Sequence, residues 1–202
     1  VIEPGDVQWM TAGSGILHKE YHEKEYAKNG RVFHMIQLWV NLPAKDKMTD
    51  PRYQALLAED MGKLELPDDG GEIIVYAGEV MGVKGPALTF SPMDIFKVTL
   101  NKEKEVTLNQ PAEYNTGMLV IDGSFQLDEE KTIEAGDFVL FENLPGDILL
   151  KGESDQASAV FLSGEPLNEP VVAGGPFVMN TVEQLDQANN DYRNGLFGSH
   201  DF

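Results

Sequence analysis

The 202-residue chain contains no cysteine, which excludes disulfides, thiolate metal sites and a cysteine nucleophile and agrees with a reducing compartment such as the cytoplasm. No apolar run approaches the roughly 20 residues of a membrane span. The first residues, Val1-Ile2-Glu3, lack the basic start and apolar core of a signal peptide. The chain does not begin with methionine either, so we interpret Val1 as an internal residue of a longer parent.

Basic residues are also scarce, with 15 Lys+Arg against 34 Asp+Glu and a formal net charge of −19. Phosphate backbones and anionic lipids are bound through clustered Lys and Arg, so we expect no direct nucleic-acid binding and no membrane docking. The remaining composition, 42% hydrophobic and 24% charged, is that of a globular protein long enough to bury a core.

Most segments have the β-branched and aromatic bias of strands and are separated by Gly, Pro and Asn. Early in the chain, strands are predicted at residues 7–11, 16–21 and 33–41, with a hairpin-type turn at 24–31. Later strands are predicted at residues 72–77, 94–100, 104–108, 116–122, 124–127, 137–142, 147–151 and 157–163. This spacing is typical of an all-β sandwich or barrel.

Two other regions break this pattern. Residues 43–71 are rich in Pro and polar side chains and are predicted to cross between two halves, with one short helix at 53–61. Near the end, Thr181 followed by Gln184 forms a capping-box pattern, which predicts a helix running to about Asn194 and stopped by Gly195.

An internal repeat links the two halves. The sequence EPGDV at residues 3–7 recurs as EAGDF at residues 134–138, and each copy is predicted to be a glycine turn followed by a strand. Several strands precede the second copy, but only two residues precede the first. The first half therefore looks cut, with its early strands missing.

His18 and Glu20 are the candidate metal ligands. On a strand at 16–21 the two side chains would share one face. Imidazole plus carboxylate suits Fe, Mn, Ni or Zn, although two ligands are only half of a site. A fixed offset from the repeat places Leu149 and Lys151 at the equivalent positions, so a metal site is expected in the first half only.

The alternatives for the other candidates are less specific. His22 continues the alternation and could approach an ion, but it fits the solvated end of the strand better. His34 is interpreted as a core or rim residue and His200 as part of a disordered tail. Trp9, Met10 and Phe33 line a substrate pocket in one interpretation and form plain core in the other.

Several long motifs resemble the pirin family of the cupin superfamily. They are PGDVQWMTAG at 4–13, GILHKE at 15–20, DPRYQ at 50–54, GEPL at 164–167, EPVV at 169–172 and GPFVMNT at 175–181. The resemblance implies an all-β bicupin with two β-barrel (double-stranded β-helix) domains, the first truncated, and a short C-terminal helix. The implied division is 1–42 for the rest of the N-terminal barrel, 43–71 for the crossover, 72–165 for the C-terminal barrel without ligands, and 166–202 for a segment packing across the barrels.

In pirins three histidines and one glutamate hold an ion, most often Fe(II), with Mn, Ni, Zn or Cu as alternatives. His18 and Glu20 match the last histidine and the glutamate, and Glu20 is the candidate general base. The other two histidines belong to a segment expected before Val1. The resemblance therefore implies that this chain alone has an incomplete site and is inactive, and that the missing segment or a second copy completes the barrel.

The resemblance leaves two main functions open. One is a quercetinase-type dioxygenase acting on a flavonol-like small molecule. The other is a non-enzymatic regulator that acts through protein contacts, either as a modulator of a metabolic enzyme in the cytoplasm or, in animals, as a nuclear co-regulator. A storage or general small-molecule-binding barrel is a third, weaker alternative.

Overall fold

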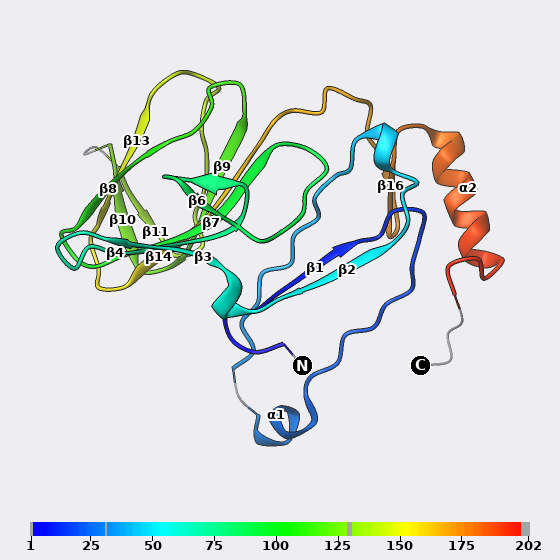
Figure 1. Cartoon of the computed structure of the whole chain (residues 1–202), viewed down its shortest axis with the longest axis horizontal. Coiled ribbons are helices and arrows are strands. Elements are labelled where there is room, and N and C mark those ends of the chain that lie inside the picture. The colour runs from blue at the N-terminus through cyan, green and yellow to red at the C-terminus, as the bar shows by residue number, and fades with distance from the viewer. Residues whose placement is uncertain (1, 31, 129–130, 199–202) are drawn as a thin grey trace. The chain divides into compact units, whose positions relative to one another are not determined.

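The computed structural model describes residues 2–30, 32–128 and 131–198 of the chain (Figure 1). The chain divides into two compact units. Unit 1 comprises Val1–Pro4, Gln8–Gln54 and Asn168–Phe202, and unit 2 comprises Gly5–Val7 and Ala55–Leu167. The finer division at residues 42, 71 and 165 stays a prediction.

Unit 2 is built almost entirely from strands. They are β3 (Gly62–Leu66), β4 (Gly71–Ala77), β5 (Glu79–Val80), β6 (Val83–Lys84), β7 (Met93–Leu100), β8 (Glu105–Asn109), β9 (Asn115–Asp122), β10 (Ser124–Leu127), β11 (Lys131–Glu134), β12 (Phe138–Leu140), β13 (Asp147–Gly152) and β14 (Ala157–Gly164), preceded by a 3-10 turn at Ala58–Asp60. All of the strands predicted between residues 72 and 163 are confirmed, with ends that differ by up to two residues.

The strands of unit 2 form two larger antiparallel sheets (Figure 1). One has six strands in the order β12-β9-β14-β7-β4-β3, and the other has four in the order β11-β10-β13-β8. Among the described residues, hydrogen-bonded pairing ends at the outer strands of each sheet, so the predicted closed barrel is seen instead as two sheets. The short hairpin β5-β6 is separate from both.

One hydrophobic core joins the two sheets of unit 2. Phe96 on β7 and Phe161 on β14 are fully buried, and their rings stack with centroids 4.8 Å apart. The four-stranded sheet contributes Phe125 and Leu150, which are also fully buried. Both sheets therefore bury side chains in one shared interior.

Unit 1 has less regular structure. Its elements are β1 (Val7–Thr11, which begins in unit 2), α1 (Lys24–Asn29), a 3-10 turn at Ala44–Asp46, β2 (Arg52–Leu56, which ends in unit 2), β15 (Val172–Gly174), β16 (Phe177–Met179) and α2 (Val182–Arg193). β1 pairs with β2 and β15 pairs with β16 (Figure 1). The predictions of β1 and of the C-terminal helix are confirmed, including the Thr181–Gln184 capping box.

Two strand predictions in unit 1 are wrong. Residues 16–21 and 33–41 form no strand, and neither segment has a strand partner among the described residues. Because an extended segment without a partner gains no ladder hydrogen bonds, sequence preference alone does not make it a strand. The aromatic side chains of the second segment are consequently exposed, with Phe33 56% and Trp39 66% accessible.

Two turn and helix predictions are also wrong. The predicted hairpin turn at 24–31 contains the short helix α1, which the Glu23 carboxylate caps by accepting from the Tyr26 N–H at 2.7 Å and which ends at left-handed Gly30. The predicted helix at 53–61 is replaced by β2 and the 3-10 turn. Side-chain burial alternates along β2, which is the period of a strand that pairs on one edge.

No helix in the described part of the chain is long and apolar enough to cross a membrane.

Candidate functional site

The chain that leads to His18 is anchored at the turn after β1. The Ser14 N–H donates to the Thr49 carbonyl at 2.8 Å, and Gly13 lies so close that a Cβ would stand 2.1 Å from the same oxygen. Gly13 also has a φ of +52°, a conformation that L side chains rarely adopt. Glycine at this position therefore permits a backbone approach that no other residue allows.

A second anchor comes from the C-terminal part of unit 1. The Leu17 N–H donates to the Phe197 carbonyl at 3.2 Å, and a Cβ on Gly15 would meet the Phe197 ring at 2.3 Å. Phe197 in turn packs edge to face on Phe177. The residue immediately before His18 is thus hydrogen-bonded to a segment about 180 residues further along the chain.

His18 and Glu20 both lie on exposed, extended chain outside any strand. The structure brings no group of three or more His, Asp or Glu side chains together among the residues it describes. The donor chemistry of the pair, one imidazole and one carboxylate, fits Fe(II), Mn(II) and related ions, but it supplies only part of a coordination shell. The ligand roles of His18 and Glu20 remain predictions.

Tyr53 is a candidate residue that the sequence reasoning did not single out. Partial burial raises the pKa of Tyr53, and the negative charge of Glu20 raises it further, so the phenol lies within electrostatic reach of that carboxylate. Tyr53 is on β2, which pairs with β1 just before the His18 segment. The motif at residues 50–54 contains Tyr53, but no local sequence pattern indicates its electrostatic interaction with Glu20.

The remaining histidines have other surroundings. The His22 ring packs on Phe33 with centroids 4.7 Å apart and meets Tyr26 at 6.3 Å. This favours the structural alternative for His22 over a ligand role. His34 is exposed, and His200 lies outside the described residues.

The two predicted pocket residues on β1 are only partly accessible. Trp9 and Met10 are both half-buried, whereas Phe33 is exposed and packs on His22. Their substrate role stays a prediction.

The internal repeat is visible as matching local geometry. Gly5 and Gly136 have nearly equal left-handed φ values of 94° and 96°, and each is followed by a strand after one aspartate. In both copies the aspartate side chain accepts a backbone N–H, Asp6 from Ala58 at 2.9 Å and Asp137 from Glu134 at 2.9 Å. The predicted glycine turns are therefore confirmed.

The second half has no ligand set at the repeat-equivalent strand. Leu149 and Lys151 pair with exposed residues of β8, and Lys151 forms an ion pair with Glu103 at 2.6 Å. Because side chains alternate along β13, the residue between them, Leu150, faces the interior and is fully buried. Neither face of this part of β13 offers an imidazole or a carboxylate.

A polar cluster ties the crossover of unit 1 to the segment after residue 168. Lys47 is 7% exposed and donates from Nζ to the Asn41 Oδ1 at 2.6 Å. Burial lowers the pKa of Lys47, and the charge of Glu169 partly offsets this. The Glu169 carboxylate also accepts the Ala44 N–H at 2.7 Å, so a charge-assisted hydrogen bond joins the motif at 169–172 to the crossover.

Comparison with known proteins shows which family the chain resembles in sequence. The pirin family model matches residues 1–40, and the model of the pirin C-terminal cupin domain matches residues 95–198. Pirin-1 of Arabidopsis thaliana is 38% identical over 98% of the chain and 67% of its own length. A Pseudomonas aeruginosa protein named as a candidate quercetin 2,3-dioxygenase is 44% identical over 97% of the chain and 68% of its own length.

Solved structures show the same relationship. A quercetin 2,3-dioxygenase from Acinetobacter baumannii superimposes with a TM-score of 0.93 at 41% identity, covering 98% of this chain and 68% of that one. A protein from Geobacillus kaustophilus gives a TM-score of 0.73 at 33% identity, covering 84% and 67%. The chain thus spans about two thirds of the length of these relatives. It has a mostly β cupin fold with a short C-terminal helix, and it belongs to the pirin family of bicupins.

Proposed function

We propose that this protein is a metal-binding pirin with quercetinase-type dioxygenase activity, and that His18 and Glu20 supply two of its metal ligands. The observation that supports this most strongly is the similarity to a quercetin 2,3-dioxygenase structure over 98% of the chain, including the His18–Glu20 segment. The finer architecture belongs to the same proposal: two barrels, of which only the first holds an ion. We expect two further histidines, from a segment outside the matched region, to complete the shell.

The proposed ion is Fe(II), with Mn, Ni, Zn or Cu as alternatives that the same nitrogen and oxygen donors accept. Such an ion, when bound, would hold a deprotonated flavonol and lower the barrier to its attack by dioxygen. Because the ligands must be deprotonated to bind, metal affinity is expected to fall in acid.

Within this proposal Glu20 is the general base. Its carboxylate is exposed and takes the proton of the substrate hydroxyl when that group comes within hydrogen-bond reach. Tyr53 has a raised pKa and therefore remains a neutral phenol near Glu20, adding no second negative charge where an anionic substrate would bind. The anchors at Thr49 and Phe197 hold the backbone before His18 and so limit its motion.

Oxygen uptake with quercetin tests the activity in the intact protein. We expect His18→Ala and Glu20→Gln each to lower kcat/KM at least about a hundredfold, because each removes a ligand or the base. His34→Ala is the matched control, since His34 is also an exposed histidine of unit 1 and has no role in the proposal. Full activity in both site variants would refute the enzymatic proposal.

A second candidate function is regulation through protein contacts. The net charge of −19 supports it, because such a surface attracts a basic protein partner and repels nucleic acid. A stoichiometric partner captured by the intact protein, together with inactivity toward flavonols at full metal loading, would favour this function over the first.

A further inference from the structure

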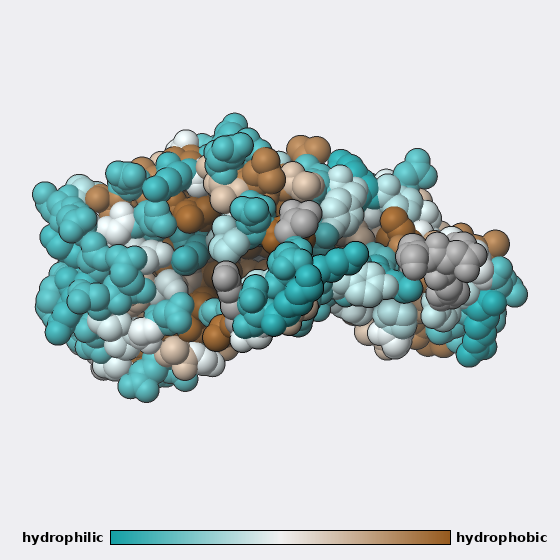
Figure 2. All heavy atoms as spheres, turned by 90° about the horizontal axis from the view of Figure 1, so that it is seen from below, coloured by the Kyte–Doolittle hydropathy of each residue, from teal (hydrophilic) through white to brown (hydrophobic). Residues whose placement is uncertain are grey.

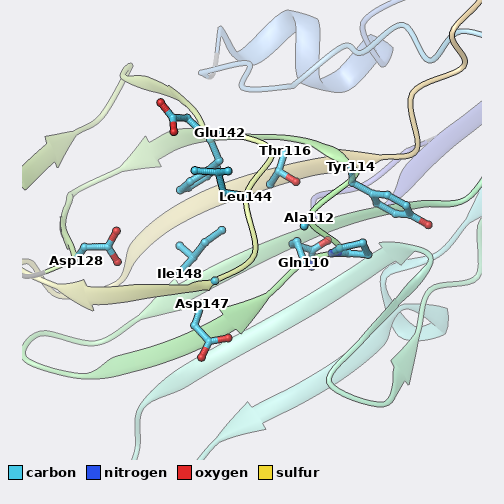
Figure 3. A pocket seen from close by; sticks show the side chains of 12 residues that line it. Gln110, Ala112, Tyr114, Thr116, Asp128, Glu142, Leu144, Asp147 and Ile148 are labelled. Atoms are coloured by element: carbon cyan, nitrogen blue, oxygen red, sulfur yellow. The ribbon is translucent and has the colours of Figure 1, made fainter.

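Unit 2 contains a pocket of about 220 Å³ that is separate from the His18 segment. Its walls come from the chain after β8, the start of β9, residues 141–146 and the start of β13 (Figure 3). Thr116 on the six-stranded sheet and Ile148 on the four-stranded sheet both line it, so the pocket opens between the two sheets. Small molecules bind preferentially at such mouths of β-barrels and sandwiches.

The middle of the pocket is apolar. Leu144 and Ile148 lie at its centre in Figure 3, and Phe141 adds an aromatic wall. The Phe141 ring stacks at 6.1 Å on Phe161, which belongs to the buried core. A flat apolar ring bound here would therefore contact side chains that the core already holds in place.

The two ends of the pocket are polar in different ways. In Figure 3 the Asp128 carboxylate lies to the left of the apolar middle and faces it, whereas the exposed Glu142 carboxylate lies to the upper left and points away from it. Thr116 and Gln110 lie to the right and carry a neutral hydroxyl and a neutral amide. The pocket thus has one anionic end and one uncharged hydrogen-bonding end.

The neutral end has unused hydrogen-bonding capacity. The Thr116 and Ser163 hydroxyls are 2.8 Å apart and share one hydrogen bond, which leaves one hydroxyl hydrogen and further lone pairs over. The Gln110 Oε1 is buried and has no hydrogen-bond partner in the described part of the chain. A donor that reaches this wall would satisfy a group that is costly to leave unpaired.

The charges of the lining select the ligand. No Lys, Arg or His lines the pocket among the described residues, so phosphates and carboxylates have no counter-charge there. Asp147 points to the opposite side of β13 from Ile148 and accepts from Asn109 at 2.8 Å. Asp128 is therefore the carboxylate that faces the middle of the pocket, and its Oδ1 also accepts the Leu149 N–H at 3.2 Å. Together with the lack of any cluster of three metal-ligating side chains in the described ranges, this argues against a bare metal ion.

We propose that this pocket of unit 2 binds a small aromatic amine that carries a hydroxyl group at the far end of its ring. The ammonium group would lie at Asp128, with the charge of the exposed Glu142 on the same side, the ring between Leu144 and Ile148, and the hydroxyl at Thr116 and Gln110. This second site lacks metal ligands and is independent of the proposed oxygenase site.

Three related probes test the proposal by chemical-shift titration of the full chain. Tyramine has both polar ends, phenethylamine lacks the hydroxyl, and 3-(4-hydroxyphenyl)propionate replaces the cation by an anion. We expect tyramine to bind saturably, phenethylamine about threefold to tenfold more weakly for loss of one hydrogen bond, and the anion at least about tenfold more weakly. Equal binding of tyramine and the anion, or no saturable binding of tyramine, would overturn the proposal.

Two variants locate the binding. Gly146 lines the pocket, has no left-handed φ, and has no atom within 4 Å of an added Cβ, so Gly146→Leu adds an apolar side chain at the pocket lining without a clash at its Cβ. It should reduce tyramine affinity at least about tenfold, whereas Ala135→Leu, in an exposed turn, should not. Unchanged affinity in Gly146→Leu would place the binding elsewhere and refute the site.

The charge of the anionic end is tested separately. Glu142→Gln should weaken tyramine binding about twofold to fivefold, the range of a solvent-accessible ion pair, and leave the neutral analogue 4-ethylphenol unaffected. Glu113→Gln removes the same charge from an exposed residue outside the pocket lining and should change neither affinity. An equal effect of both variants on tyramine would show general electrostatic attraction and contradict the assigned orientation.

Discussion

Two glycines with almost the same backbone conformation allow the contribution of the Gly13–Thr49 contact to stability to be measured. Gly13 and Gly30 have φ values of +52° and +59°. An added Cβ on Gly13 would stand 2.1 Å from the Thr49 carbonyl oxygen, whereas on Gly30 it would meet nothing within 4 Å. Alanine at either position has the same left-handed strain and the same effect on the unfolded chain, so the difference between the variants isolates the close approach.

The magnitudes follow from these contacts. Gly30→Ala should lower the free energy of unfolding by about 1 kcal/mol, the left-handed penalty less the gain from a stiffer unfolded chain. Gly13→Ala adds the displacement of the Thr49 carbonyl and the loss of the 2.8 Å hydrogen bond from Ser14. That loss is worth about 1 kcal/mol, so the total should reach about 2–3 kcal/mol.

Chemical denaturation at 25 °C measures both variants, with the midpoint and the slope fitted together. The account predicts that Gly13→Ala is the more destabilising by at least about 1 kcal/mol. An equal loss of unfolding free energy in the two variants would show that the turn after β1 accommodates the new methyl group without displacing Thr49. That result would refute the close contact.

Three further predictions concern other parts of the fold. Thr181→Ala removes the N-cap of α2 and should lower the free energy of unfolding by about 1 kcal/mol, measured by denaturation. Phe161→Ala leaves a cavity beside Phe96 in the core of unit 2 and should cost about 3–5 kcal/mol, measured in the same way, unless the core collapses around it. Burial raises the pKa of Asp94 despite the hydrogen bond from the Glu79 N–H. The ionised carboxylate therefore lowers the stability of the folded protein at pH values above the ordinary carboxyl pKa, and this loss is absent below that pKa. Asp94→Asn should therefore raise stability at pH 7 and lose that advantage below about pH 4, and a variant that is less stable at pH 7 would contradict the sign.

The sequence predicted unit 2 better than unit 1 for a physical reason. In unit 2 each strand has neighbours, so alternating apolar residues such as Val106 and Leu108 of β8, and the nearly continuous buried runs of β7 and β14, find a shared interior. The local preference then agrees with the tertiary structure. On the face drawn in Figure 2, hydrophilic side chains predominate at the left. Burial and pairing reinforce the same assignment in unit 2.

In unit 1 the same local signals lack partners. Residues 33–41 read as a strand, yet they stay unpaired and expose Trp39, because strand formation depends on a neighbour that local sequence cannot specify. Glu23 similarly turns a predicted hairpin into a helix by capping it through a single hydrogen bond. These errors come from tertiary context and from one cap, and not from the hydrophobic pattern.

The sequence was enough to propose a candidate site but not to predict its surroundings. The residue types and spacing of His18 and Glu20 were sufficient to propose a metal pair. The proximity of Tyr53 and the anchors from Thr49 and Phe197 depend on pairing and packing between segments far apart in sequence, which a single sequence does not encode in a local motif. The pocket of unit 2 likewise lies between two sheets, so its lining comes from segments that no local motif brings together.

Metal content of the intact protein tests the central proposal most directly. After anaerobic reconstitution with Fe(II) and desalting, elemental analysis should find about one ion per chain, since only one half has the ligand pair. His18→Ala should lose most of that ion, while the exposed control His34→Ala should keep it. Equal iron in the two variants, or none in the unmodified protein, would contradict the assignment of His18 and Glu20 as metal ligands.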